Sequence, residues 1–361
     1  MIIMNILRKL LVNIRSFNNS KILFILVLVL VTNFTFGLIF YLLEKDVQNI
    51  SLLDSIWWAM VTMTTVGYGD FFPKTVYGRF LLSYPTMLIG IGIIGYIIGN
   101  IADYILDFTS RKRRGLIMIN KENHIIICNY PGEDKLLSVI NELRFVPELQ
   151  FSPIVLITEL LDELPEILKD KGVLFVKGEP INENTFLKAN VFQSLGVIIL
   201  SEDQSSKSDE RCYTVSSMIE IMEKNYGKPI KTITEVVKDS NFSLMKRAEV
   251  DGIVGTENIN TQLIVQEFVN PGINDVFKQF FTNSIGSQFY ISDCKLEGNR
   301  FKDIQIKAIS FEEDIQIIGV INGTKTDLNP SKEYVIKEGD RVIFLSQKFS
   351  VYRKFEQKIL N

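Results

Sequence analysis

Two long apolar segments flank the run Thr62–Asp70 (TMTTVGYGD), and this arrangement restricts the fold more than any other feature of the chain. The first segment, Ile22–Leu43, carries no charge and is long enough to cross a bilayer as a helix. The second begins at Val76 and is interrupted by glycines. The run between them would lie at membrane depth, where non-helical backbone is tolerated only if it is buried or lines a water-filled path.

Two glycines give this run unusual backbone freedom. Gly67 and Gly69 lack a Cβ and can adopt left-handed backbone angles that other residues avoid. If alternate residues take such angles, every carbonyl of the run can face one axis, while Val66 and Tyr68 point outward and hold a ring open. A plain turn is the alternative for a Gly-x-Gly sequence, but the preceding threonines, the following Asp70 and the flanking spans favour a pore.

The sequence Thr65–Gly69 reads TVGYG, which resembles the selectivity filter of potassium channels. The resemblance implies that backbone carbonyls replace the water shell of the permeating K⁺ ion. It places K⁺ at Thr65, Val66, Gly67 and Tyr68, with Gly69 completing the filter.

The same resemblance implies a set of residues that support the filter. These are Thr64, Trp57, Trp58 and Asp70. Both tryptophans are expected to pack around Tyr68, with Trp57 hydrogen-bonded to Asp70. The alternative role of the tryptophans is to anchor the chain at the membrane interface.

The expected pore domain covers residues 21–110. It consists of a transmembrane helix at 22–43, a pore helix at 51–64, the filter at 65–69 and a second transmembrane helix at 76–106. Asp54 places a negative charge near the positive end of the pore helix. One filter segment cannot close a pore by itself, so the sequence predicts a homotetramer in the lipid bilayer.

The second span has features that suit an inner helix. In channels of this layout an inner-helix glycine is a gating hinge, and Gly90 or Gly92 is the candidate; close helix packing is the alternative. Asp103 and Asp107 share one helix face because they are four residues apart. They would either form a negative ring at the inner mouth or be ordinary solvated carboxylates.

Basic residues predict the orientation of the chain. Arg8, Lys9 and Arg15 lie in an amphipathic segment, residues 1–20, that is expected to rest on the membrane as an interfacial helix, and Arg111–Arg114 follow the second span. The positive-inside rule then makes both termini cytoplasmic in a multi-pass plasma membrane protein. A net charge of −3 gives no reason to expect nucleic acid binding.

After a linker at residues 111–122, short apolar runs alternate with helical patterns, which predicts a doubly wound parallel sheet. The run His124–Cys128, the sequence Gly178-Glu179-Pro180 and the later Asn329-Pro330 resemble the regulator-of-potassium-conductance (RCK) domain, which is similar to bacterial TrkA-type regulators. The resemblance implies a Rossmann-like domain at 123–258, a crossover helix-turn-helix at 259–282 and a small α+β subdomain at 283–361. It also implies that RCK domains pair into an octameric cytosolic gating ring.

The usual dinucleotide fingerprint is absent after the first of these strands. Asn129, Pro131 and Asp134 occupy the three glycine positions, and Gly132 lies among them. A proline donates no N–H, and acidic residues repel a phosphate. Asn129 and Gly132 remain the candidate cofactor positions, but the pattern argues against NAD.

Acidic residues follow several strands, where the ligands of such sheets bind. They are Glu159, Glu179, Glu202, Asp203 and Glu235. Converging carboxylates suit Ca²⁺, which prefers oxygen ligands. Solvated loop acids are the alternative, and the calcium site implied by the RCK resemblance is incomplete because Ser201 and Val237 stand at two of its positions.

Together these features predict a K⁺-selective channel, not an enzyme, gated by an intracellular ligand that binds the RCK ring. Calcium or another divalent cation is the first candidate ligand, and a nucleotide (NAD, ADP/ATP or a cyclic dinucleotide) is the alternative. A membrane-anchored Rossmann oxidoreductase is the competing interpretation. It lacks a glycine fingerprint, and the single histidine, His124, opens an apolar run that suggests a structural role.

Overall fold

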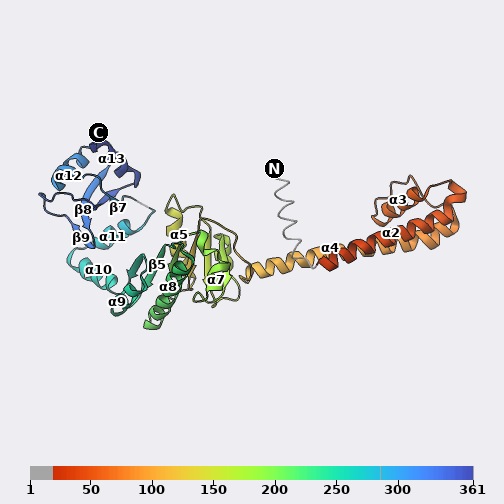
Figure 1. Cartoon of the computed structure of the whole chain (residues 1–361), viewed down its shortest axis with the longest axis horizontal. Helices are drawn as coiled ribbons and strands as arrows, with labels where there is room; N and C mark the ends of the chain where they lie inside the picture. Colours follow the sequence, from red (N-terminus) through yellow and green to blue (C-terminus); the bar gives the residue numbers. More distant parts are fainter. Residues whose placement is uncertain (1–18, 285, 361) are drawn as a thin grey trace. The chain divides into compact units, whose positions relative to one another are not determined.

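The computed structural model describes residues 19–284 and 286–360 (Figure 1). Residues 1–18 of the predicted interfacial helix lie outside these ranges, and so do Arg8, Lys9 and Arg15. The chain divides into two compact units, residues 1–110 and residues 111–361.

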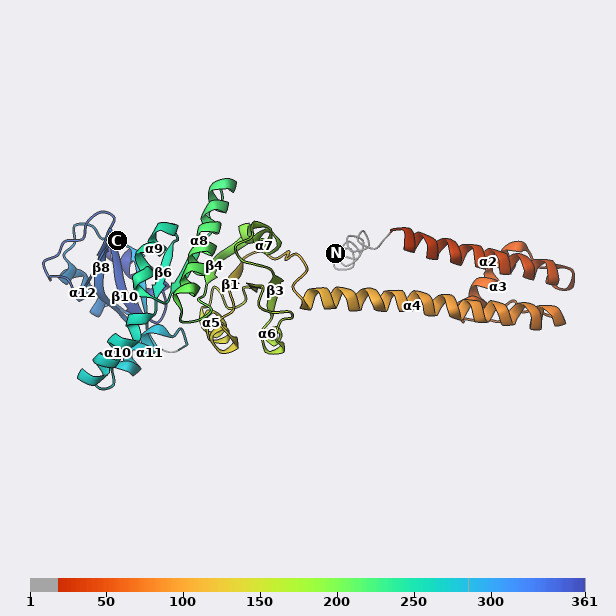
Figure 2. The ribbon, with the colours of Figure 1, turned by 90° about the horizontal axis from the view of Figure 1, so that it is seen from below.

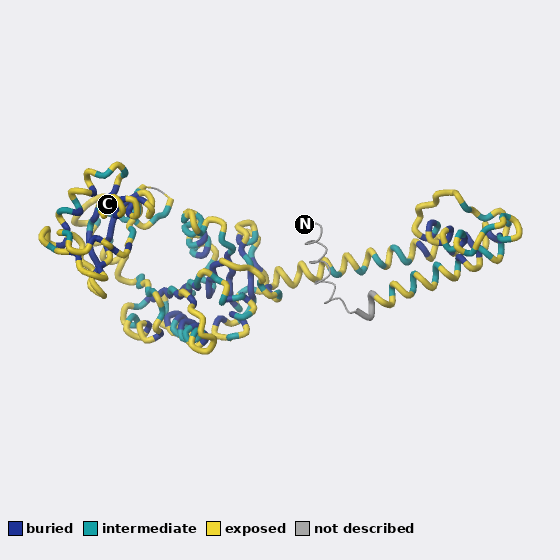
Figure 3. Tube along the Cα trace, turned by 45° about the horizontal axis from the view of Figure 1, so that its top comes forward, coloured by how far each residue is buried: buried dark blue, intermediate teal, exposed yellow. Residues whose placement is uncertain are grey.

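The first unit contains two long helices and a short one between them (Figure 2). They are α2 (Asn19–Gln48), α3 (Leu52–Met63), a π-helical turn η1 (Gly78–Leu82) and α4 (Ser83–Arg113). Two stretches, Leu23–Gln48 and Gly78–Arg113, are long and apolar enough to cross a membrane. Their outward surfaces are largely exposed in the single chain (Figure 3), as expected for helices that face lipid or further subunits.

Helix α4 ends seven residues beyond the predicted span 76–106 and so extends into the predicted linker at 111–122. Its last turn carries Arg111, Lys112 and Arg113. Cations at this end interact favourably with the negative pole of the helix dipole, which supports the longer helix.

The second unit begins with a six-stranded parallel sheet of order β3-β2-β1-β4-β5-β6. The strands are β1 (His124–Cys128), β2 (Ile154–Thr158), β3 (Val173–Lys177), β4 (Ser194–Ile199), β5 (Thr232–Val236) and β6 (Gly252–Gly255). This order is that of a doubly wound Rossmann-like sheet. It confirms the predicted fold class.

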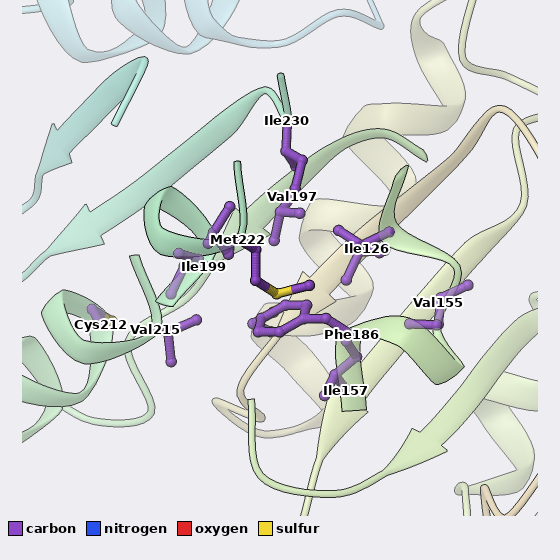
Figure 4. Packing of buried hydrophobic residues seen from close by; sticks show 14 of the residues in the cluster. Ile126, Val155, Ile157, Phe186, Val197, Ile199, Cys212, Val215, Met222 and Ile230 are labelled. Atoms are coloured by element: carbon purple, nitrogen blue, oxygen red, sulfur yellow. The ribbon is translucent and has the colours of Figure 1, made fainter. Parts of the chain in front are cut away.

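Helices cover both faces of the sheet because its strands are apolar on both sides. One face packs against α7 (Glu183–Lys188) and α8 (Ser206–Tyr226), with Phe186 and Met222 among the buried side chains (Figure 4). The other face packs against α5 (Glu133–Phe145) and α6 (Glu166–Asp170), through Leu136 and Leu168.

Two elements differ from the apolar runs that predict them. Strand β4 begins three residues before the run at Val197, because Ser194 and Gly196 pair with β1 although neither has an apolar side chain. The helical pattern Phe242–Ala248 forms α9 (Phe242–Met245) and a 3₁₀ turn, Lys246–Ala248. A 3₁₀ turn at Asp239–Asn241 precedes them, and another, Val191–Gln193, precedes β4.

The crossover region forms α10 (Glu257–Val269) and α11 (Ile273–Phe281), joined at Pro271-Gly272. A four-stranded antiparallel sheet follows, of order β7-β10-β8-β9. Its elements are β7 (Gln288–Asp293), α12 (Phe301–Ile309), β8 (Ile315–Asn322), β9 (Lys325–Leu328), β10 (Arg341–Ser346) and α13 (Ser350–Leu360). Its core combines aliphatic side chains of β8 and β10 with aromatic side chains of α12 and α13, including Phe301 and Tyr352.

Candidate functional site: the filter, the strand ends and the linker

Helix α3 is fixed at its start by a capping box. The Ser51 hydroxyl accepts a hydrogen bond from the Asp54 backbone N–H, and the Asp54 carboxylate accepts one from the Ser51 N–H. Helix α2 packs tightly behind α3, since a Cβ on Gly37 would lie 2.8 Å from Ile56 Cα. The helix is therefore defined at Leu52–Met63, slightly shorter than the predicted 51–64.

The filter backbone alternates between two conformations. Thr65, Gly67 and Gly69 have φ angles of 61°, 59° and 77°, so every second residue is left-handed. The Val61 carbonyl at the end of α3 accepts hydrogen bonds from the N–H groups of Val66 (3.0 Å) and Gly67 (3.3 Å). This alternation turns successive peptide planes so that their carbonyls can line one side of the segment.

Thr65 is the unexpected member of this series. A β-branched residue is seldom left-handed. Its N–H donates to Thr62 O at 3.1 Å, and the neighbouring Thr64 hydroxyl donates to Met60 O at 2.7 Å. The two-residue spacing of Gly67 and Gly69 extends back to Thr65, and this alternation is the sequence signal for its angle.

Behind the filter, the two tryptophans have different contacts. Trp57 stacks on Tyr68 with ring centroids 5.8 Å apart, and its Nε1–H donates to Asp70 Oδ2 at 2.8 Å. Trp58 is buried and stacks on Phe40 of α2 at 3.9 Å. Within one chain, then, Trp57 packs on Tyr68 and Trp58 packs on α2, because successive residues of a helix point about 100° apart. Packing of both tryptophans around Tyr68 in the assembled pore stays a prediction.

A buried carboxylate clamps the segment that follows the filter. Glu44 of α2 is fully buried and accepts hydrogen bonds from the N–H groups of Lys74 and Thr75, both at 3.0 Å, and from the Thr75 hydroxyl at 2.5 Å. Gln48, one turn later, donates to Glu44 and to Phe72 O. Sequence reasoning missed this residue, although an acid at the end of an apolar span is a usable signal of function.

Glu44→Gln is expected to weaken this clamp. The new amide NH₂ would face backbone N–H donors, and losing hydrogen bonds to a charged group costs about 1.5–3 kcal/mol each. We expect a lower unfolding temperature of the purified channel and a faster decay of K⁺ current during sustained opening. Asp46→Asn, the same change at an exposed residue of α2, is the control. Equal effects of both variants would contradict a specific role of Glu44.

The two candidate hinge glycines occupy different surroundings in α4. A Cβ on Gly90 would lie 2.5 Å from Met63 Cα and O, so this glycine lets α4 approach the end of α3. Gly92 has no such neighbour among the described residues, and the helix continues through both positions. Asp103 and Asp107 are exposed in the single chain.

At the carboxyl edge of the parallel sheet, the predicted acids meet basic side chains. Arg211, near the start of α8, lies 2.5 Å from Glu159 Oε1 through Nη2, and its Nε lies 3.1 Å from Glu202 Oε1. Burial raises the pKa of Glu202, and the Arg211 charge opposes this shift. Glu179 and Asp203 are exposed, and Asp203 accepts hydrogen bonds from the N–H and the hydroxyl of Ser205.

Glu235 has its own counter-ion. Lys135 of α5 lies 2.6 Å from its carboxylate, which also accepts a hydrogen bond from the Ser201 N–H at 2.8 Å. Among the described residues, no group of three or more acidic, histidine or cysteine side chains is placed to hold a metal ion. The five predicted acids are thus near the same edge, but they do not form one metal-binding cluster within the chain.

The candidate cofactor positions follow β1. Asn129 is buried with φ 71°, donates to Leu200 O at 2.9 Å and accepts from Arg211 Nε at 3.0 Å. Gly132, with φ 101°, precedes α5, whose first turn carries Glu133 and Asp134. The space that a pyrophosphate occupies in dinucleotide-binding sheets is bordered here by an arginine network and by two acids.

The histidine and one of the cysteines lie buried within the second unit. His124 is buried with Nε2 2.9 Å from Ala189 O, and burial lowers its pKa. The buried Cys212 thiol has its pKa raised to about 11 by burial. Both side chains serve packing of the sheet.

The segment that leaves α4 belongs to the second unit and is hydrogen-bonded to the rest of that unit along its length. The Arg113 carbonyl accepts from Leu164 N–H at 3.2 Å, and the Gly115 carbonyl accepts from Lys177 N–H at 2.9 Å. Further on, Ile119 N–H donates to Lys188 O at 2.8 Å. Gly115 is buried with φ 65° and contacts the end of edge strand β3. The glycine at position 115 is a sequence signal for this close contact, but the sequence does not predict which strand it contacts.

Comparison with known families matches three consecutive parts of the chain. Residues 27–107 match the model of a family described as "Ion channel". Residues 120–234 match "Calcium-activated potassium channel slowpoke-like RCK domain", and residues 257–360 match "Castor and Pollux, part of voltage-gated ion channel".

Curated relatives match this chain over most of their length. "Calcium-gated potassium channel TvoK" of Thermoplasma volcanium is 28% identical over 81% of this chain and 81% of its own. "Probable potassium channel protein 2" of Methanocaldococcus jannaschii is 24% identical over 87% of this chain and 91% of its own. A solved structure titled "GsuK channel bound to NAD" covers 91% of this chain and 57% of its own, at 17% identity and a TM-score of 0.47.

Proposed function

This chain is homologous to potassium channels that carry an RCK domain, and on that premise we propose that it forms a K⁺-selective pore from four copies around one axis. The observation that carries the proposal is the left-handed backbone at Thr65, Gly67 and Gly69, between two helices long enough to span a membrane. Potassium passes through the carbonyl oxygens of Thr65–Tyr68. Trp57 and Asp70 hold the filter open from behind.

The exposed surfaces of the single chain support assembly. Val66 and Tyr68 of the filter are 54% and 69% exposed, which leaves them free to contact neighbouring subunits. Phe268 of α10 and Phe281 of α11 are 88% and 67% exposed, in the region where two RCK domains are expected to clasp. We propose that RCK domains pair through α10 and α11 into a ring of eight, whose further copies come from other channel subunits or from separately made soluble domains.

The protein is a membrane protein, and two helices in the described part of the chain are long and apolar enough to span the bilayer. The basic end of α4, Arg111–Arg114, supports a cytosolic position of the RCK domain, by the positive-inside rule. On this reasoning both termini are cytoplasmic and the membrane is the plasma membrane.

The ring opens or closes the pore when a ligand binds its two states unequally. The calcium-gated relative supports a divalent cation as the ligand, and a nucleotide remains the alternative. Movement of the ring reaches α4 through the docked segment at Gly115 and bends the inner helix at Gly90 or Gly92. Asp103 and Asp107 then concentrate K⁺ at the inner mouth.

Single-channel recording of the purified protein in a planar bilayer tests this proposal. Under symmetric potassium we expect K⁺-selective openings whose probability changes reversibly when calcium on the RCK side is stepped. Selective openings that ignore calcium would keep the channel and move the search to nucleotides. Absence of K⁺-selective current from folded protein would overturn the channel function itself.

A further inference from the structure

The Arg211 guanidinium lies between the ends of three parallel strands. Its partners are Asn129 after β1, at 3.0 Å, Glu159 after β2, at 2.5 Å, and Glu202 after β4, at 3.1 Å. These residues come from separate loops that meet only at the carboxyl edge of the sheet. Three oxygen-bearing side chains thus surround one cation that belongs to the chain itself.

This network is largely shielded from water. The side chains of Arg211, Glu159 and Glu202 are 26%, 29% and 23% exposed. Glu159 Oε2 and Glu202 Oε1 are inaccessible and accept no hydrogen bond within the described part of the chain. The 3.1 Å contact between Glu202 Oε1 and Arg211 Nε is an ion pair, because the Nε–H donates to Asn129. Two carboxylates this close and this shielded would repel each other without a positive charge between them.

The oxygen atoms around Arg211 are of the kind that calcium selects. Carboxylate and amide oxygens are the ligands a divalent hard cation prefers. Here the same atoms face a planar guanidinium, which is always charged and donates in several directions at once. Such an arrangement supplies charge balance without an external ion.

We propose that the Arg211 guanidinium is the resident cation of this edge and holds the Glu159 and Glu202 carboxylates together as a diffusible divalent cation would. The site therefore needs no bound metal in the native chain. Any divalent cation that gates the pore acts elsewhere. The inference concerns the RCK domain and does not rest on the proposed channel function.

Lys135 and Glu235 extend the same principle to the neighbouring strand. The Glu235 side chain is 10% exposed and pairs with Lys135 at 2.6 Å, from the first turns of α5. Glu159, Glu202 and Glu235 are thus each paired with a basic side chain of the same chain, whereas the buried Asp209 accepts hydrogen bonds from the N–H groups of Val237 and Lys238. Because Lys135 pairs with Glu235, Arg211 is the basic side chain that balances Glu159 and Glu202.

The test compares calcium binding to full-length protein in detergent, measured by equilibrium dialysis. We expect Arg211→Ala to bind calcium at least tenfold more tightly than the native protein does, since the vacated oxygens then need a cation. Arg211→Lys, which keeps a charge, should resemble the native protein. Arg211→Ala combined with Glu159→Gln and Glu202→Gln should lose the gained binding.

The test remains decisive even if the Arg211→Ala variant does not fold. If Arg211→Ala unfolds during purification, the proposal predicts that millimolar calcium restores a folded protein, and failure of that rescue would contradict it. The proposal is also overturned if folded Arg211→Ala gains no calcium binding, or if native protein binds calcium and loses it in Glu159→Gln. A K⁺ flux assay on the same samples reports separately whether the pore functions.

Discussion

Gly67→Ala is expected to abolish K⁺-selective conduction while leaving the RCK domain folded. Gly67 has φ 59°, and an alanine in the left-handed region costs about 1–2 kcal/mol. In a tetramer this free-energy cost arises once in each of the four subunits, so the filter backbone is expected to leave the conducting conformation. The measurement is the ratio of K⁺ to Na⁺ flux into liposomes that contain the purified variant.

Gly99→Ala is the matched control for that substitution. Gly99 lies within α4 with an ordinary helical φ, and apart from the adjoining turns of α4 no atom of the described residues lies within 4 Å of its would-be Cβ. Alanine is favoured over glycine in a helix by about 1 kcal/mol. A Gly67→Ala channel that remains K⁺-selective would refute the requirement for a left-handed backbone at this filter position.

Gly115→Val is expected to disconnect the pore from the ring. A Cβ at this position would press on the Lys177 backbone nitrogen and lie 2.7 Å from the Phe175 ring, so the segment cannot stay docked on β3. The pore should remain K⁺-selective, but its open probability should no longer respond to the ligand that gates the native channel. Single-channel recording before and after ligand addition measures both properties.

Gly172→Val separates steric blockage from backbone strain. Gly172 lies before β3 with φ 73°, similar to the 65° of Gly115, but among the described residues no atom other than those of its chain neighbours lies within 4 Å of its would-be Cβ. Strain alone would affect the two variants equally. If Gly115→Val retains a native ligand response, the docked segment is not the route by which the ring acts on α4.

The sequence predicts backbone features well where the signal is local. The glycine spacing in the filter predicts the left-handed angles at Gly67 and Gly69. Alternating apolar runs and helical patterns predict the parallel sheet, because strand and helix periodicities depend on neighbouring residues alone. The paired Ser51 and Asp54 likewise place the start of α3.

Contacts between distant residues are where sequence reasoning falls short. The acids after the strands appear as a potential metal site in sequence, because carboxylates without visible partners resemble free ligands. Arg211 pairs with Glu159 across 52 positions and Lys135 with Glu235 across 100. Which loops meet at the sheet edge decides these pairings, and the strand order is a property of the whole domain.

The sequence by itself determined a two-span pore with a filter segment, followed by an alternating α/β domain, since hydrophobic length, glycine placement and periodicity act over short distances along the chain. The tertiary structure alone decided which charges neutralise each other and where segments dock. Glu44 binds Lys74 and Thr75, some 30 positions away, and Gly115 docks on the end of β3 at Lys177. The physical reason is that electrostatic pairing and close packing depend on distances in space, which the fold sets only once its strands and helices have assembled.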